Sequence, residues 1–263
     1  MDNRPIGVFD SGFGGISVLA AAAALLPKER FVYIGDNLHA PYGERTEAEI
    51  LLLSRKSVQF LTEKGCKAVV IACNTATSVA ADALRSELSL PIVAMEPALK
   101  PASLIAQEGQ VLVLATEITL KLSKFKQLME SYGRDAVPIP APKFVTAVEA
   151  GMIQGPEIAA LFDETLGPYL QKPVKAVVLG CTHYTFLKPA LRAYLPKHIA
   201  LIDGNEGTAR QLEKRLAQAS LQGACMETDV MKRVEFYSTK PGPQTPERMR
   251  AMFQTALAQL PER

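Results

Sequence analysis

The segments "KAVVIACNTATS" (67–78) and "KAVVLGCTHYTF" (175–186) are near-copies of one another, and they decide the predicted fold. Each begins with an apolar run and reaches a cysteine, Cys73 or Cys181, that is followed by hydroxylated or polar residues. Runs of this kind are typical of strands that are buried on both faces of a parallel sheet. We interpret the two segments as one strand built twice by internal duplication. The alternative is a chance likeness, because such runs are common in parallel sheets.

The sequence around these runs alternates between strand and helix patterns, which indicates an α/β fold. A capping box from Thr46 to Glu49 predicts a helix start, and Gly65 predicts the end of that helix. In the first part we expect strands at 6–10, 30–36, 67–72 and 91–96 and helices at 14–26, 46–65 and 75–88. In the second part we expect strands at 110–116, 175–180 and 199–204 and helices at 118–132, from Pro156 onward and at 186–194.

The tail of the chain has no counterpart between the two repeats. It contains an amphipathic helix after Gly204, a strand in "RVEFYST" (233–239) and a last helix at 246–259, and we expect it to pack on the first unit. The predicted fold is therefore α/β, with two similar doubly wound parallel-sheet domains related by internal duplication and the active site in the cleft between them. The predicted domains are 1–96 together with 206–263, and 97–205.

The composition excludes several classes of protein. A chain of 263 residues with 48% apolar and 21% charged residues is typical of a soluble globular protein. The net charge of +2 gives no bulk attraction for nucleic acid or an anionic membrane. No apolar stretch is long enough to span a bilayer. Four cysteines without a C-x-x-C pair favour a reduced, cytoplasmic protein, and neither a metal-ligand spacing nor a phosphate-binding loop is present.

Several reactive side chains follow predicted strands, where open parallel sheets bind their ligands. They are Asp10, Ser11, Cys73, Asn74, Thr75, Thr116, Cys181, Thr182 and His183. A single cysteine at a strand end is most often a small buried apolar residue, and we assign that role to Cys66 and Cys225. A matched pair has another use, because a thiolate and a thiol on opposite faces of a carbon can remove one proton and return another, which inverts the stereocentre. A nucleophilic Cys181–His183 pair is the alternative, but it leaves Cys73 unexplained.

Five segments together resemble, in order, the signature segments of bacterial glutamate racemases. They are "GVFDSGFGG", "YIGDNLHAPYG", "ACNTATS", "FVTAVEAG" and "GCTHY", and the resemblance runs from about residue 6 to residue 205. It implies two α/β domains with the site between them. It also implies interconversion of L- and D-glutamate without a cofactor or metal, and a supply of D-glutamate for peptidoglycan.

The resemblance also implies the roles of individual residues. Cys73 and Cys181 are expected to be the acid/base residues, and Asp10, Glu149 and His183 are expected to assist them. The expected substrate-binding residues are Asp10, Ser11, Tyr42, Gly43, Asn74, Thr75, Thr116, Thr182 and His183. Structural alternatives are a helix cap for Asp10, a solvated Glu149 and simple packing of Tyr42 in its turn.

Two other functions stay open at this point. One is racemisation of aspartate or another amino acid, and the other is a binding role without turnover, since some members of the family also bind DNA gyrase. The expected partners are a small-molecule substrate and a second copy of the chain in a homodimer, with no membrane and no nucleic acid.

Overall fold

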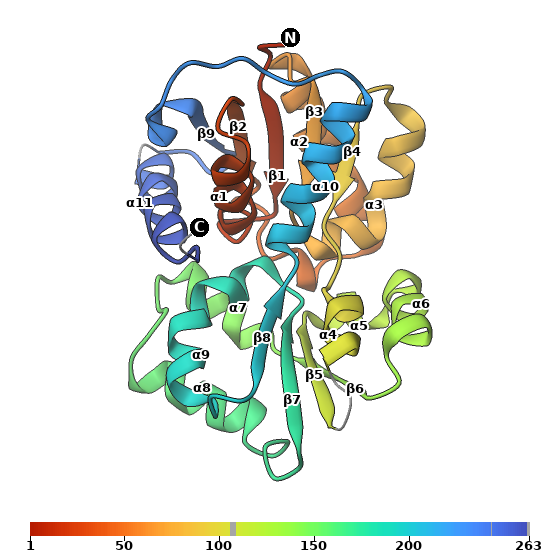
Figure 1. The fold of residues 1–263 in the computed structure, drawn as a ribbon, viewed down its shortest axis with the longest axis vertical. Helices are drawn as coiled ribbons and strands as arrows, with labels where there is room; N and C mark the ends of the chain where they lie inside the picture. The colour runs from red at the N-terminus through yellow and green to blue at the C-terminus, as the bar shows by residue number, and fades with distance from the viewer. Residues whose placement is uncertain (106–108, 243, 262–263) are drawn as a thin grey trace. The chain divides into compact units, whose positions relative to one another are not determined.

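A computed structural model describes residues 1–105, 109–242 and 244–261. The chain divides into two compact units, each with its own parallel sheet (Figure 1). The first contains Met1–Met95 and Asn205–Arg263, and the second contains Glu96–Gly204. Among the residues described, no helix has both the length and the apolar character needed to cross a membrane.

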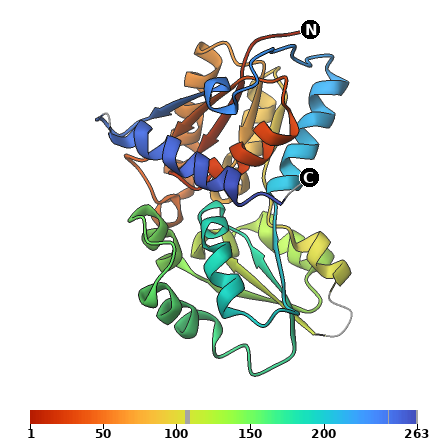
Figure 2. The same ribbon diagram turned by 60° about the vertical axis from the view of Figure 1, so that its left-hand side comes forward.

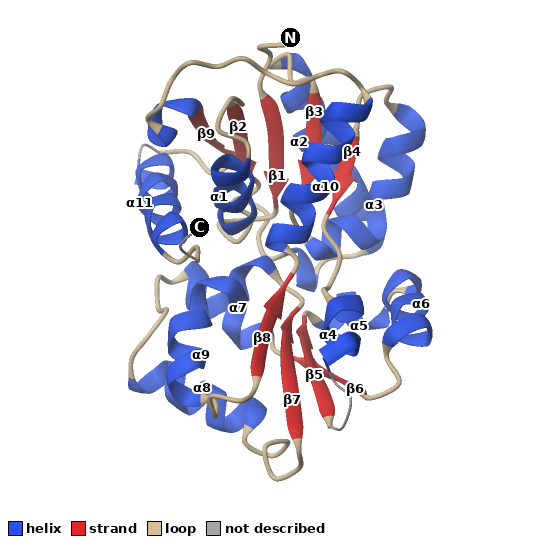
Figure 3. Cartoon of the chain, in the orientation of Figure 1, coloured by secondary structure: helices blue, strands red, loops and turns tan. Residues whose placement is uncertain are grey.

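The first unit is built on a five-stranded parallel sheet (Figure 3). Its strands β1, β2 and β3 are buried along their whole length, which explains why their sequences are continuous apolar runs rather than alternating ones. The strand order is β4 (Ile92–Ala94), β3 (Ala68–Ile71), β1 (Ile6–Asp10), β2 (Phe31–Gly35) and β9 (Val234–Ser238).

Helices cover both faces of this sheet. Figure 2 shows α1 (Ile16–Leu25) and α11 (Gln244–Ala258) on one face, where α10 (Asn205–Gln218) also packs on α1. The other face carries α2 (Glu47–Glu63) and α3 (Asn74–Glu87), which pack on each other. Helix α2 starts with the predicted capping box at Thr46 and Glu49, and Gly65 follows its end with a φ of 72°.

The second unit has a four-stranded parallel sheet in the order β6 (Ala136–Pro140), β5 (Gln110–Ala115), β7 (Val174–Leu179) and β8 (Ala200–Asp203). Alternate residues of β5 and β7, such as Val113 and Val178, pack in a core with Leu99 and Phe125. Its helices are α4 (Leu99–Ile105), α5 (Glu117–Lys121), α6 (Ser123–Tyr132), α7 (Pro142–Glu149), α8 (Pro156–Leu166) and α9 (Lys188–Tyr194).

The two sheets share one topology. In each unit the second strand in the chain lies at one side of the first strand, and the third and fourth strands lie at the other side. This agreement confirms the α/β fold with two similar parallel sheets. Strand β9 is an addition that pairs with β2 in the first unit, so the prediction that the tail packs on this unit is confirmed.

One helix prediction was wrong, and another helix starts two residues later than its approximate predicted start. The single helix expected at 118–132 is interrupted at Leu122, whose backbone is extended (φ −71°, ψ 147°) while its side chain is buried. The α-helix expected at 186–194 begins only at Lys188, because the preceding Thr182–Leu187 segment forms a buried 3₁₀ helix, η2. Its Thr, Tyr and Phe residues are poor formers of α-helix, and a tight 3₁₀ turn suits such a short segment.

Candidate active site

Each sheet has a point where the strand order reverses, between β1 and β3 in the first unit and between β5 and β7 in the second. Ligands of doubly wound sheets bind beyond the carboxyl ends of the strands at this point. Asp10 ends β1 and Ser11 follows it, and Cys73 follows β3. In the second unit Thr116 follows β5 and Cys181 follows β7. The two cysteines therefore occupy the same topological position, each in its own unit.

Cys73 is the N-cap residue of α3. Its Sγ accepts a hydrogen bond from the backbone N–H of Ala76 (3.4 Å) and lies 3.5 Å from Ser11 Oγ. The side chain is buried. The first N–H groups of a helix carry partial positive charge, so this position stabilises a thiolate relative to a thiol.

Asn74 carries buried polar atoms directly beside Cys73. Its side chain is 4% exposed, and both its amide nitrogen and its amide oxygen have no hydrogen-bond partner within the residues that the structure describes. Buried amides are almost always hydrogen-bonded, so a doubly unpaired amide beside a cysteine at a strand end is matched to a polar ligand. Thr75, the next residue of α3, is also buried.

Asp10 is fully buried at the end of β1. Its Oδ2 accepts a hydrogen bond from the N–H of Gly12 (3.0 Å). The N-cap residue of α1 is Gly15, not Asp10. A buried carboxylate at the sheet's switch point can bind a cation such as an ammonium group.

Tyr42 and Gly43 lie in a 3₁₀ turn, η1 (Tyr42–Glu44), in the loop after β2. The Tyr42 side chain is fully buried against Phe9, and its hydroxyl donates to Asp36 Oδ2 (2.7 Å). Burial, and then the charge of Asp36, raises the pKa of Tyr42 well above its ordinary value. The packing role considered for Tyr42 is therefore present, together with a specific hydrogen bond.

In the second unit Cys181, His183 and Glu149 form a chain of contacts. Cys181 Sγ lies 3.7 Å from His183 Nδ1, and His183 Nε2 lies 2.6 Å from Glu149 Oε1. Burial alone would lower the pKa of His183, but the hydrogen bonds to Cys181 and Glu149 outweigh it, and this pKa lies well above 6.5. A protonated His183 places positive charge next to Cys181 Sγ. Glu149 is partly buried and paired, not simply solvated.

Two threonines complete the predicted set. Thr116 is the N-cap of α5, where its hydroxyl accepts from the N–H of Thr119 (3.4 Å) and lies 2.8 Å from the Thr119 hydroxyl. Thr182 is buried at the start of η2, directly after Cys181. Thr116 thus has a structural role as a helix cap.

The other two cysteines lie in different surroundings. Burial, with a smaller effect of the charge of Glu235, raises the pKa of Cys66 to about 12, so its thiol is unreactive near neutral pH. Cys225 lies in the segment between α10 and β9. No group of three or more His, Cys, Asp or Glu residues that could hold a metal ion occurs in the described part of the chain.

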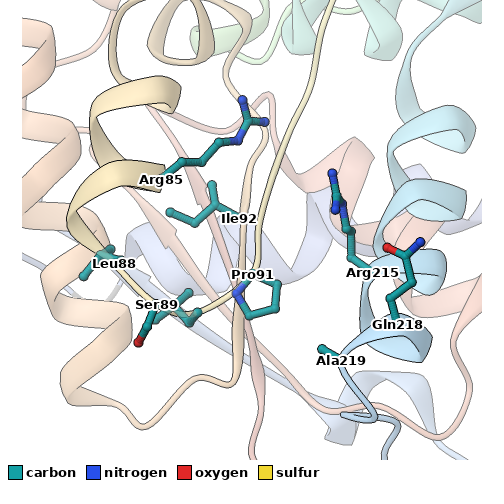
Figure 4. A pocket seen from close by; sticks show the side chains of 9 residues that line it. Arg85, Leu88, Ser89, Pro91, Ile92, Arg215, Gln218 and Ala219 are labelled. Atoms are coloured by element: carbon teal, nitrogen blue, oxygen red, sulfur yellow. The ribbon is translucent and has the colours of Figure 1, made fainter.

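A pocket of about 410 Å³ lies in the first unit between α3 and α10 (Figure 4). It is next to Pro91 and Ile92, at the amino end of β4, whereas Cys73 lies at the carboxyl edge of the same sheet. Its two arginines, Arg85 and Arg215, are both exposed, and Arg85 pairs with Asp82. This pocket is therefore separate from the candidate site.

Sequence reasoning did not single out Asp36, which accepts from the Tyr42 hydroxyl, or His39 and Thr239, which contact the other oxygen of the same carboxylate. Asp36 follows β2 and could have been noticed as another acidic residue at a strand end. Thr239 gave no such signal, because its place depends on the pairing of β9 with β2.

Known proteins resemble this chain over most of its length. The sequence pattern of the Asp/Glu/hydantoin racemase family matches residues 16–212. A glutamate racemase of Clostridium perfringens (strain SM101 / Type A) is 47% identical over 225 residues, which is 84% of this chain and 86% of that protein.

Two solved structures share the fold. The Escherichia coli glutamate racemase, solved with L-glutamate and the activator UDP-MurNAc-Ala, has a TM-score of 0.85 and 30% identity, over 96% of this chain and 95% of that one. The Francisella tularensis glutamate racemase, solved with D-glutamate, has a TM-score of 0.80 and 28% identity, over 96% and 94% of the two chains.

Proposed function

Because this chain belongs to the Asp/Glu/hydantoin racemase family, we propose that it interconverts L- and D-glutamate by proton transfer between its own side chains, with no cofactor or metal. The observation that supports this best is the equivalence of Cys73 and Cys181. Each follows the third strand of a like-ordered sheet, and the sulfur of each contacts a nitrogen that can carry positive charge: the Ala76 N–H at a helix start, or the His183 ring.

The proposed reaction needs one thiolate and one thiol. The thiolate takes the α-proton of glutamate and leaves a carbanion, and the other thiol donates its proton to the opposite face of that carbon. One proton is removed and one is added, so the substrate is inverted and the two cysteines exchange protonation states. By family resemblance, Cys181 takes the proton from L-glutamate and Cys73 takes it from D-glutamate.

Neighbouring groups are proposed to supply positive charge beside both sulfurs during this step. His183, held by Glu149, supplies positive charge beside Cys181. The start of α3 does the same for Cys73, with Ser11 within 3.5 Å of its sulfur. Asp10 is proposed to assist on this side.

Substrate recognition is assigned to the remaining polar groups. Asp10 is proposed to bind the ammonium group, since it is a buried carboxylate. The unpaired amide of Asn74, with Thr75, Thr116 and Thr182, is proposed to hold carboxylate oxygens. The turn at Tyr42 and Gly43 is proposed to receive the distal carboxylate.

The test follows the optical activity of L- and D-glutamate by circular dichroism, with metal-free protein. We expect the signal of either enantiomer to decay to zero. Cys73→Ser and Cys181→Ser should each suppress racemisation by at least about a hundredfold, because an alcohol is a far poorer base than a thiolate near neutral pH. Cys225→Ser serves as the matched control and should racemise at the rate of the wild type.

The same assay separates the alternatives. Turnover of aspartate but not of glutamate would replace the proposed substrate while leaving the two-thiol chemistry in place. No change in optical activity with any amino acid would instead favour a binding role. A wild-type rate in either serine variant at position 73 or 181 would refute the two-thiol mechanism.

We also propose the cellular setting that the resemblance implies: a cytoplasmic homodimer, whose two compact units are its two domains, that supplies D-glutamate for peptidoglycan. Size-exclusion chromatography with light scattering tests the dimer, and a monomeric mass at micromolar concentration would refute it. Dependence of growth on added D-glutamate after deletion of the gene tests the supply role.

A further inference from the structure

The loop after β2 is held by one buried carboxylate, Asp36, which is 1% exposed. Three side chains converge on it. Its Oδ2 accepts from the Tyr42 hydroxyl (2.7 Å), and its Oδ1 accepts from the Thr239 hydroxyl (2.6 Å) and lies 2.8 Å from His39 Nδ1. A carboxylate has about four acceptor positions, so it can take all three donors at once.

Thr239 comes from the far end of the chain. It directly follows β9, which lies next to β2 in the sheet (Figure 1), and its N–H donates to the carbonyl of Gly35 (3.1 Å). The Thr239 hydroxyl also accepts from the N–H of Leu38 (3.2 Å). Thr239 thus binds the loop at two points, through a strand that lies beyond the residues 16–212 that match the family.

This arrangement limits what Tyr42 can do for a substrate. A phenol has one proton, and Tyr42 donates it to Asp36. The ring is fully buried against Phe9, so the side chain anchors the turn in the core of the first unit. What the turn can then offer to an anion is its backbone N–H groups, including that of Gly43, as turns at anion sites commonly do.

We propose that Asp36 and Thr239 are positioning residues for substrate binding. They hold Tyr42, and through it the Tyr42–Gly43 turn, in the geometry that receives the distal carboxylate of the substrate. The added strand β9 then serves the active site as well as the fold. This inference rests on the proposed function, because it takes the turn to be part of the glutamate site.

The test uses Thr239→Val, which keeps the size of the side chain and removes its hydroxyl. Thr239→Ser restores the hydroxyl, and Thr255→Val removes a hydroxyl that bonds within its own helix, at the Ala251 carbonyl. Three quantities are measured in all variants: the hydrogen exchange of peptides covering residues 36–45, the KM for glutamate and the kcat.

We expect Thr239→Val to speed exchange in residues 36–45 and to raise KM about tenfold, which corresponds to the loss of one hydrogen bond to a charged group. The change in kcat should be smaller, because the thiols are untouched. Thr239→Ser should recover the exchange rate and the KM, and Thr255→Val should leave both unchanged. Tyr42→Phe should also raise KM, and its effect should not add to that of Thr239→Val, since both act through Asp36.

Several results would overturn the inference. One is equal exchange and KM in Thr239→Val and Thr255→Val. Another is faster exchange with an unchanged KM, which would show that the loop does not contribute to substrate binding. If Thr239→Val does not fold, Asp36→Asn replaces it, because an amide offers one acceptor oxygen where the carboxylate offers two. Absence of glutamate turnover in the wild type would refute the proposed function itself, whereas full turnover with an unaltered Thr239→Val variant refutes only the inference.

Discussion

Glu149→Gln tests the electrostatic account of the Cys181 side. In the wild type a 2.6 Å hydrogen bond joins His183 Nε2 to Glu149 Oε1, and the His183 side chain is 3% exposed. A hydrogen bond to a charged group contributes about 1.5–3 kcal/mol. Loss of this interaction with the protonated ring should therefore lower the pKa of His183.

Nuclear magnetic resonance of protein with labelled histidine rings gives this pKa directly. The chain has three histidines, so the spectra are simple, and His183→Gln identifies the signal. Glu164→Gln is the matched control, because Glu164 pairs with exposed Lys143 on the surface of the second unit. An unchanged His183 pKa in Glu149→Gln, or an equal change in Glu164→Gln, would refute the reasoning.

The same substitution should change how stability depends on pH. Since the pKa of His183 is higher in the folded protein than in the unfolded chain, its protonation favours the folded state. This contribution is complete below the unfolded pKa of about 6.5 and is lost as the pH rises through the folded value. The deficit of Glu149→Gln in free energy of unfolding should therefore be greatest in mild acid and shrink in alkali.

Three further predictions concern specificity, stability and reactivity. Glutamine should be a very poor substrate, because a site built for a distal carboxylate is left unpaired by an amide; kcat/KM values equal to those of glutamate would contradict this. Lys67→Met should cost about 3–5 kcal/mol in a denaturant titration, because it leaves Glu29, its buried partner at 2.6 Å, without a counter-charge. The exposed Lys143→Met is the control, and an equal loss there would exclude this cause. With its pKa raised to about 12, Cys66 should react with thiol reagents at pH 8 much more slowly than Cys225; equal rates would contradict its burial.

Much of the fold could be predicted because its strands carry their own signal. A strand buried on both faces, such as Ala68–Ile71, must be apolar along its length, and the duplication shows the same pattern twice. The capping box at Thr46 is a local signal as well. The break at Leu122 could not be predicted, because the residue is apolar and suits either a continuous helix or an extended link to the core.

Some residues of the candidate site could likewise be predicted from local sequence, and others could not. Residues that follow strands directly, such as Asp10 and Cys73, could be chosen from the sequence alone. The pairing of His183 with Glu149 depends on the packing of α7 against η2, and Thr239 reaches Asp36 only through the β2–β9 pairing. Contacts of this kind join residues that are far apart in the chain, and no local pattern encodes them.

The two cysteines occupy the same position in like-ordered sheets, but their surroundings differ. Cys73 caps the 14-residue helix α3, whose N–H groups hold a fixed partial charge that no pH change removes. Cys181 precedes a six-residue 3₁₀ helix and makes no such cap, and the positive charge beside it belongs to His183. An imidazolium loses its charge when the pH exceeds its pKa, so Glu149 is needed to keep that charge in place. The thiol at position 181 therefore depends on a second, titratable residue for what the thiol at position 73 receives from the backbone.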